Sequence, residues 1–115
     1  MKVKVGAFLY DLDWAPEVKA DDGKSLYGQI EYDCEKIHIN TKYSEQKQRV
    51  SILHEILHAI DDVVGWQIKE NLIHTLAIQL IDLCDNNPEL MTILFPQTAV
   101  PGPLNCGKPL KEEQT

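Results

Sequence analysis

The sequence lacks the features that would place it among membrane or secreted proteins. No apolar run approaches the roughly 20 residues that a membrane-spanning helix needs. The basic and then apolar N-terminus is interrupted by Asp11 and Asp13 and has no small-residue cleavage site, so a strand is expected there and not a signal peptide. These absences predict a soluble chain without a membrane partner.

Cysteine and positive charge are both scarce. The three cysteines, Cys34, Cys84 and Cys106, are widely spaced and form no Cys-x-x-Cys pair, which favours free thiols in a reducing, cytoplasmic compartment. The 11 basic residues are outnumbered by 18 acidic ones, and the formal net charge is -7. A surface of this sign repels phosphates, so a nucleic-acid partner is not expected.

Proline and glycine are sparse until the chain nears its end. The 115 residues are enough for one domain, but four of the six prolines and two of the six glycines follow Phe95. We therefore predict a single domain over residues 1–95 and a flexible Pro/Gly-rich tail over residues 96–115. Truncation after Leu104 is expected to leave the fold intact.

Apolar patterns in the first forty residues predict three short strands. They lie at residues 2–10, 26–32 and 36–40. Residues 11–23 contain a proline and an Asp-Gly pair and are expected to form a loop. The polar residues 33–35 suit a hairpin turn, so the predicted sheet is three-stranded and mostly antiparallel.

After residue 40 the apolar period changes to three and four residues, which is typical of amphipathic helices. Ser44 is the expected cap of the first helix and Gly65 its expected stop. A second helix is predicted over about residues 69–84, and a short third helix over residues 88–95 opens on a proline. A small sheet packed on these helices belongs to the α+β class.

Residues 54–58 read His-Glu-Ile-Leu-His in the middle of the first predicted helix. Helix positions i and i+4 lie on one face, so His54 and His58 can share one zinc ion. Glu55 is placed to act as the general base toward a water molecule that the zinc activates. The competing interpretation is a hydrogen-bonded histidine pair at a helix edge.

A catalytic zinc site needs a third protein ligand, and the second helix supplies the candidates. If the chain turns back at Gly65, the first turns of that helix lie near His58. Glu70 and His74 share a face there, four residues apart. Glu70 is the favoured ligand because a carboxylate completes a two-histidine, one-glutamate set. His74 remains an alternative ligand, an outer partner of the site or a transition-state donor.

Other polar residues near the motif have weaker claims. A carboxylate such as Asp61 or Asp62 can orient a zinc-bound histidine, but a solvated acidic pair is the favoured interpretation. His38 faces away from the apolar side of its strand and is expected to be an exposed strand histidine.

Together these residues resemble a known family. His54-Glu55-x-x-His58 on one helix and Glu70 on the next look like the gluzincin clan of zinc peptidases in its minimal form. Residues 54–62 and 69–90 are also similar to short phage-encoded relatives of the ImmA/IrrE-type peptidases. The resemblance covers residues 26–95 and implies a zinc-dependent metallopeptidase that acts on a protein or peptide inside a cell, in the host cytoplasm if the chain is phage-encoded.

The chain departs from related patterns at specific positions. A thermolysin-like sequence places an aspartate four residues after the glutamate ligand, where this chain has His74. A metzincin would have glycine at position 61 and a ligand at position 64, where this chain has aspartate and valine. The family's transition-state donor has three candidates here, Tyr32, Tyr43 and His74.

An interaction module that binds zinc and keeps the fold without turnover is the alternative function, and the presence of Glu55 favours the enzyme. So short a chain predicts a shallow cleft and not the pocket of about 300–1,000 Å³ that is typical of small-molecule sites. We therefore expect recognition of one or few protein substrates, with an edge strand, residues 26–32 or 36–40, pairing with an extended substrate chain. The sequence does not predict the oligomeric state.

Overall fold

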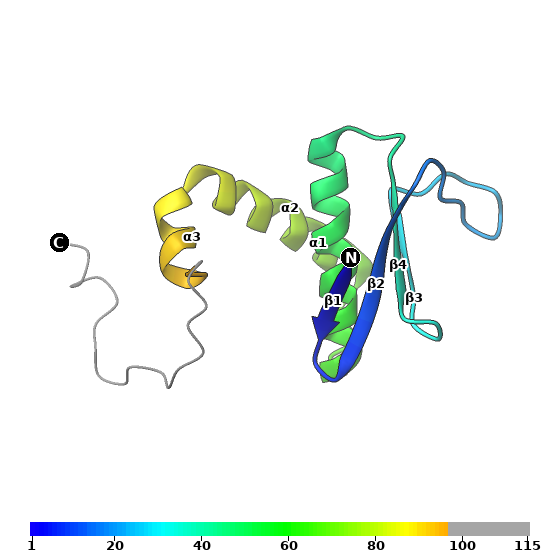
Figure 1. Cartoon of the computed structure of the whole chain (residues 1–115), viewed down its shortest axis with the longest axis horizontal. Helices are drawn as coiled ribbons and strands as arrows, with labels where there is room; N and C mark the ends of the chain where they lie inside the picture. The colour runs from blue at the N-terminus through cyan, green and yellow to red at the C-terminus, as the bar shows by residue number, and fades with distance from the viewer. Residues whose placement is uncertain (97–115) are drawn as a thin grey trace. The chain divides into compact units, whose positions relative to one another are not determined.

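A computed structural model describes residues 1–96 of the chain (Figure 1). Its elements are β1 (Lys2–Val5), β2 (Phe8–Ala15), β3 (Gly28–Glu31), β4 (Lys36–Asn40), α1 (Glu45–Val64), α2 (Glu70–Asn86) and α3 (Pro88–Leu94). The α+β class is confirmed. The chain divides into two compact units at a boundary within α2, between Ile81 and Asp82. The predicted tail beyond Pro96, with the truncation point at Leu104, lies outside the described residues.

The sheet has four strands in the order β1-β2-β4-β3, so the prediction of three strands is wrong. The error lies in the first fifteen residues. Gly6 adopts the left-handed conformation, with φ of 60°, and turns the chain between β1 and β2, which pair as an antiparallel hairpin. β2 then continues to Ala15, through residues predicted to be a loop, because Leu12 packs in the core and this segment pairs with β4.

The sheet is mixed: β1–β2 and β3–β4 pair antiparallel, as most of the predicted sheet does, but β2 and β4 run parallel. The chain leaves β2, passes through a loop with an isolated bridge between Lys19 and Ser25, and returns as the antiparallel β3–β4 hairpin. That hairpin places β4 beside β2 and leaves β3 at the edge of the sheet (Figure 1). Its turn falls at residues 33–35 as predicted, with Glu35 at a left-handed φ of 53°.

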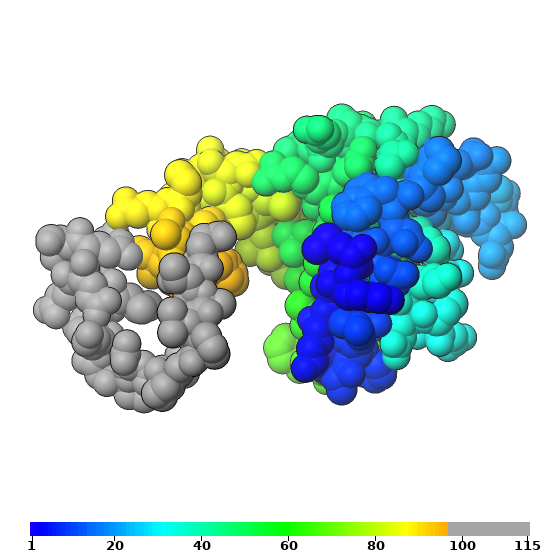
Figure 2. All heavy atoms as spheres, viewed as in Figure 1, coloured from blue at the N-terminus to red at the C-terminus, as the bar shows by residue number. Residues whose placement is uncertain are grey.

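One face of the sheet packs on α1, which contacts β1, β3 and β4. The buried core consists of Val5, Tyr10, Leu12, Ile37, Ile39 and Ala59. Ile37 and Ile39 face the core together, which confirms the alternation predicted for β4. In the space-filling view the N-terminal hairpin, in dark blue, lies against green atoms of α1 (Figure 2).

The ends of α1 are set by local chemistry. The Ser44 hydroxyl accepts a hydrogen bond from the N–H of Lys47 at 3.3 Å, and Gly65 adopts a left-handed φ of 72° at the other end. Both caps are as predicted. In the second unit, α3 opens on Pro88, also as predicted. Within residues 1–96 no helix combines the length and apolarity that crossing a membrane requires.

Candidate metal centre

The middle of α1 brings two imidazoles together. The Nε2 atoms of His54 and His58 are 3.1 Å apart, as expected for side chains one helical turn apart on the same face. Ligand atoms of His54, Glu55 and His58 all lie within 4.8 Å of one another, and the group could hold a metal ion.

Glu70, the first residue of α2, reaches both histidines. Its Oε1 lies 2.6 Å from Nε2 of His54, and its Oε2 lies 2.6 Å from Nε2 of His58. The side chains of His54 and His58 are only 15% and 19% exposed, whereas that of Glu70 is 67% exposed. The cluster is therefore buried on the α1 side and open to solvent on the α2 side.

The two imidazole nitrogens fit a tetrahedral divalent cation, whereas their 2.6 Å contacts with Glu70 are ion-pair distances, shorter than the separation of two zinc ligands. Zinc–nitrogen bonds of about 2.0–2.1 Å at tetrahedral angles place two nitrogens about 3.3 Å apart, close to the separation of the His54 and His58 nitrogens. Both nitrogens point at the same carboxylate, so negative charge faces the space between them. Burial lowers the pKa of His54, against the opposing effect of Glu70, and this favours the neutral imidazole that metals bind.

Glu55 is a buried carboxylate, 6% exposed, beside this cluster. Its burial, and then the charge of Glu70, raises its pKa to about 7. Gly28 of β3 lies directly against it, since a Cβ on Gly28 would be 3.5 Å from Cγ of Glu55 and 3.1 Å from the carbonyl oxygen of His38. A carboxyl group that titrates near neutrality can both accept and release a proton at pH 7.

A cavity of about 630 Å³ adjoins the cluster. One wall comes from β3 and its flanks, with Gly28 and Tyr32, and a second from α1. The first half of α2 supplies a third wall, with Glu70, His74 and Ile78. The prediction of a shallow cleft is therefore wrong, because the sheet and the two helices on which it was based enclose more space than the length of the chain suggests.

The three candidate transition-state donors separate into two groups. Tyr32 and His74 line the cavity, and the His74 ring lies edge-on to His54 with ring centroids 5.6 Å apart. Burial, and then the charge of Asp62, raises the pKa of Tyr32 to about 12, which keeps its hydroxyl protonated. Tyr43 is engaged elsewhere, since its ring packs on Tyr27 at 4.3 Å between centroids.

Two residues with weaker claims also have defined places. His38 lies outside the cluster, with its Nε2 atom 2.9 Å from a carboxylate oxygen of Glu31. Asp61 is not the solvated residue that was expected. Its Oδ2 accepts a hydrogen bond from the N–H of Ile68 at 3.0 Å, and its Oδ1 is buried without a hydrogen-bond partner within residues 1–96. In the sequence, only its position three residues after His58 connected Asp61 with the site.

No family model matches this chain, and no curated protein or solved structure matches it. The resemblance to gluzincins thus rests on the motif residues alone. The function has to be argued from the geometry of the site.

Proposed function

We propose that this protein is a zinc metallopeptidase in which His54, His58 and Glu70 bind one zinc ion and Glu55 is the general base. The observation that carries the proposal is that the Glu70 carboxylate and the two imidazole nitrogens converge on one place, with the nitrogens 3.1 Å apart. Glu55 also belongs to the metal-binding group, but Glu70 faces both nitrogens at once. We therefore assign Glu70 to the metal and Glu55 to the proton.

The chemistry divides between the ion and the chain. A bound zinc ion supplies Lewis acidity, which acidifies a water molecule and polarises a carbonyl group. Glu55 takes the proton of the attacking water and delivers it to the leaving amine, and its buried position beside the cluster suits this transfer. Tyr32 and His74 face the same cavity and can hydrogen-bond the carbonyl oxygen as negative charge develops on it.

The free edge of β3 favours a peptide as the substrate. The backbone carbonyl of Tyr27 accepts a hydrogen bond from the N–H of Asn40 at 3.0 Å. Residues 27, 29 and 31 therefore direct their backbone N–H and C=O groups toward β4. By alternation, Gly28 and Ile30 direct theirs toward the open edge, and both residues line the cavity. An extended chain added to this edge would run past Glu55 and the histidines.

Metal analysis and hydrolysis test the proposal together. Protein purified without a metal-affinity tag should carry one zinc per chain, and His54→Ala should carry none. Zinc-loaded protein should make discrete cuts in peptides or candidate cell proteins, and a chelator should stop them. Cleavage that persists in Glu55→Gln would assign the activity to a contaminant. Stoichiometric zinc with no cleavage of any substrate would favour the interaction module.

A further inference from the structure

One end of the cavity carries charge of the opposite sign to the metal cluster. Among the described residues that line the cavity, Lys47 is the only lysine or arginine, whereas the metal end holds Glu55 and Glu70. The Lys47 ammonium lies 5.7 Å from the ring centroid of Tyr27 and 5.9 Å from that of Tyr43. The Lys42 ammonium lies 6.0 Å from the Tyr43 centroid. Lys47 therefore lies near both rings of this pair and Lys42 near one of them, in a chain whose net charge is -7.

The aromatic pair that supports these cations is held by several contacts. The Tyr43 hydroxyl is hydrogen-bonded to the Ser25 hydroxyl at 3.0 Å. The Tyr43 carbonyl accepts a hydrogen bond from the side-chain amide of Gln48 at 2.8 Å. The fully buried Asn40 donates to the carbonyl of Leu26, next to Tyr27, at 2.9 Å. The rings attract the ammonium groups without neutralising them. Within residues 1–96 neither lysine forms an ion pair with a carboxylate.

The distance from this end to the metal cluster can be read along α1. Lys47 precedes His54 by seven residues, and Val50 and Ser51 line the cavity between them. Seven helical residues extend about 10 Å along the axis. An extended peptide advances about 3.3 Å per residue, so about three substrate residues span the same distance.

We propose that Lys47 binds a carboxylate of the substrate about three residues from the scissile bond. The proposal rests on the peptidase function and adds a substrate class to it, peptides with an anionic group at that spacing. Such a carboxylate can belong to an aspartate or glutamate side chain or to the C-terminus of a short peptide. The two sources present the same chemistry and are separated by the experiment.

Peptide binding to the zinc-loaded Glu55→Gln variant tests the subsite without turnover. Fluorescent amidated peptides would carry glutamate or glutamine three residues to either side of a central apolar pair, and a second set would end at that spacing as a free acid or an amide. Fluorescence anisotropy should show the acidic member of one pair binding about two- to fivefold more tightly, the range of a single exposed charge pair. The difference should shrink at high salt.

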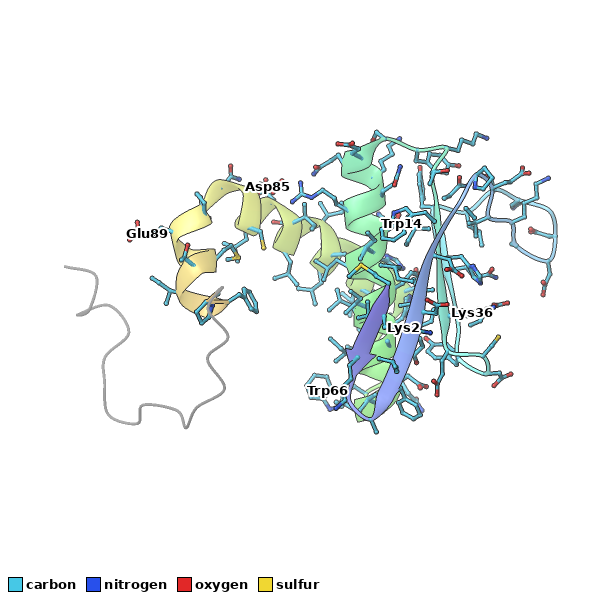
Figure 3. The ribbon with its side chains drawn as sticks, in the orientation of Figure 1. Lys2, Trp14, Lys36, Trp66, Asp85 and Glu89 are labelled. Atoms are coloured by element: carbon cyan, nitrogen blue, oxygen red, sulfur yellow. The ribbon has the colours of Figure 1, made fainter. Side chains whose placement is uncertain are left out.

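Charge reversal identifies the residue responsible. In the Glu55→Gln background, Lys47→Glu should reverse the preference, so that a lysine peptide binds better than the glutamate peptide. This substitution keeps the backbone N–H of residue 47, which donates a hydrogen bond to the Ser44 hydroxyl at the start of α1. Lys36→Glu is the matched control, because Lys36 is exposed on β4 and is not among the residues that line the cavity (Figure 3). Its preference should equal that of the parent.

The outcomes separate this proposal from the peptidase function. Equal binding of acidic and amide peptides, an unchanged preference in Lys47→Glu, or no peptide binding at all would overturn the subsite. If the wild-type protein cleaves glutamate and glutamine peptides equally well, the peptidase function stands and the subsite falls. In a further outcome, the wild-type protein binds acidic peptides selectively, with a preference that Lys47→Glu reverses, and yet cleaves none of them. That result would support the subsite and refute the peptidase function.

Discussion

The carboxylate of Asp61 and the backbone N–H of Ile68 are hydrogen-bonded at 3.0 Å across the turn that joins α1 to α2. The carbonyl of Asp61 also accepts the N–H of Gly65, at 2.7 Å. Asp61 therefore holds both ends of a turn that includes Gln67 in a left-handed conformation, with φ of 57°. Glu70 follows Ile68 by two residues, so this turn sets the position of the carboxylate that faces the two histidines.

We predict that Asp61→Ala weakens zinc binding about tenfold or more, which is the usual effect of losing a residue that positions a metal ligand. Asp61→Asn should restore most of the affinity, because an amide oxygen can accept the same hydrogen bond. Competition with a chromophoric chelator measures the affinity, and Asp62→Ala is the control. If Asp61→Ala and Asp62→Ala bind zinc equally well, the turn does not position Glu70.

Glu55→Gln should separate metal binding from catalysis. The variant is expected to fold and to hold one zinc, because the metal is assigned to His54, His58 and Glu70. Its turnover should fall by about 10²–10⁴-fold, the range over which a general base contributes. Zinc stoichiometry by elemental analysis and single-peptide kinetics test the two halves. Loss of zinc from the variant would make Glu55 a ligand instead of a base.

Gly28→Ala should affect catalysis more than metal binding. The new Cβ would lie 3.1 Å from the carbonyl oxygen of His38, 3.3 Å from Cδ1 of Ile39 and 3.5 Å from Cγ of Glu55. Crowding of this kind costs about 1–3 kcal/mol of stability, which denaturant titration measures. We expect hydrolysis to fall while zinc affinity stays close to that of the parent, because none of these atoms belongs to an assigned ligand. Unchanged stability and turnover would show that β3 moves aside freely.

The Tyr32 hydroxyl gives the protein a pH dependence at high pH. Its pKa of about 12 in the folded protein lies above the ordinary value of 10.0. Below about pH 10 both the folded and unfolded chains keep this proton, and between pH 10 and 12 only the folded chain does, so stability falls as pH rises through this window. Tyr32→Phe should show a smaller decline between pH 10 and 12. Urea titrations of chelator-treated protein measure the free energy of unfolding at each pH. An equal decline in the parent and in Tyr32→Phe would contradict the raised pKa of Tyr32.

Several parts of the candidate site were predictable because they depend on neighbouring residues in the chain. The four-residue spacing of His54 and His58 places both on one face of any α-helix. The caps at Ser44 and Gly65 follow from a side-chain oxygen and from the absence of a Cβ. The alternation of Ile37 and Ile39 identifies the buried face of β4. Each of these features needs only local geometry.

The tertiary structure decided how distant segments meet. A period of two shows which face of a strand is buried but not which strand it pairs with, so the parallel pairing of β2 with β4 was not predictable. The same holds for Gly28 against Glu55 and for the cavity wall that α2 adds. Asp61 looked like one half of a solvated acidic pair, because only the folded turn brings the N–H of Ile68 to its carboxylate. Contacts between residues far apart in sequence arise from the packing of whole elements, and no local pattern in the chain records them.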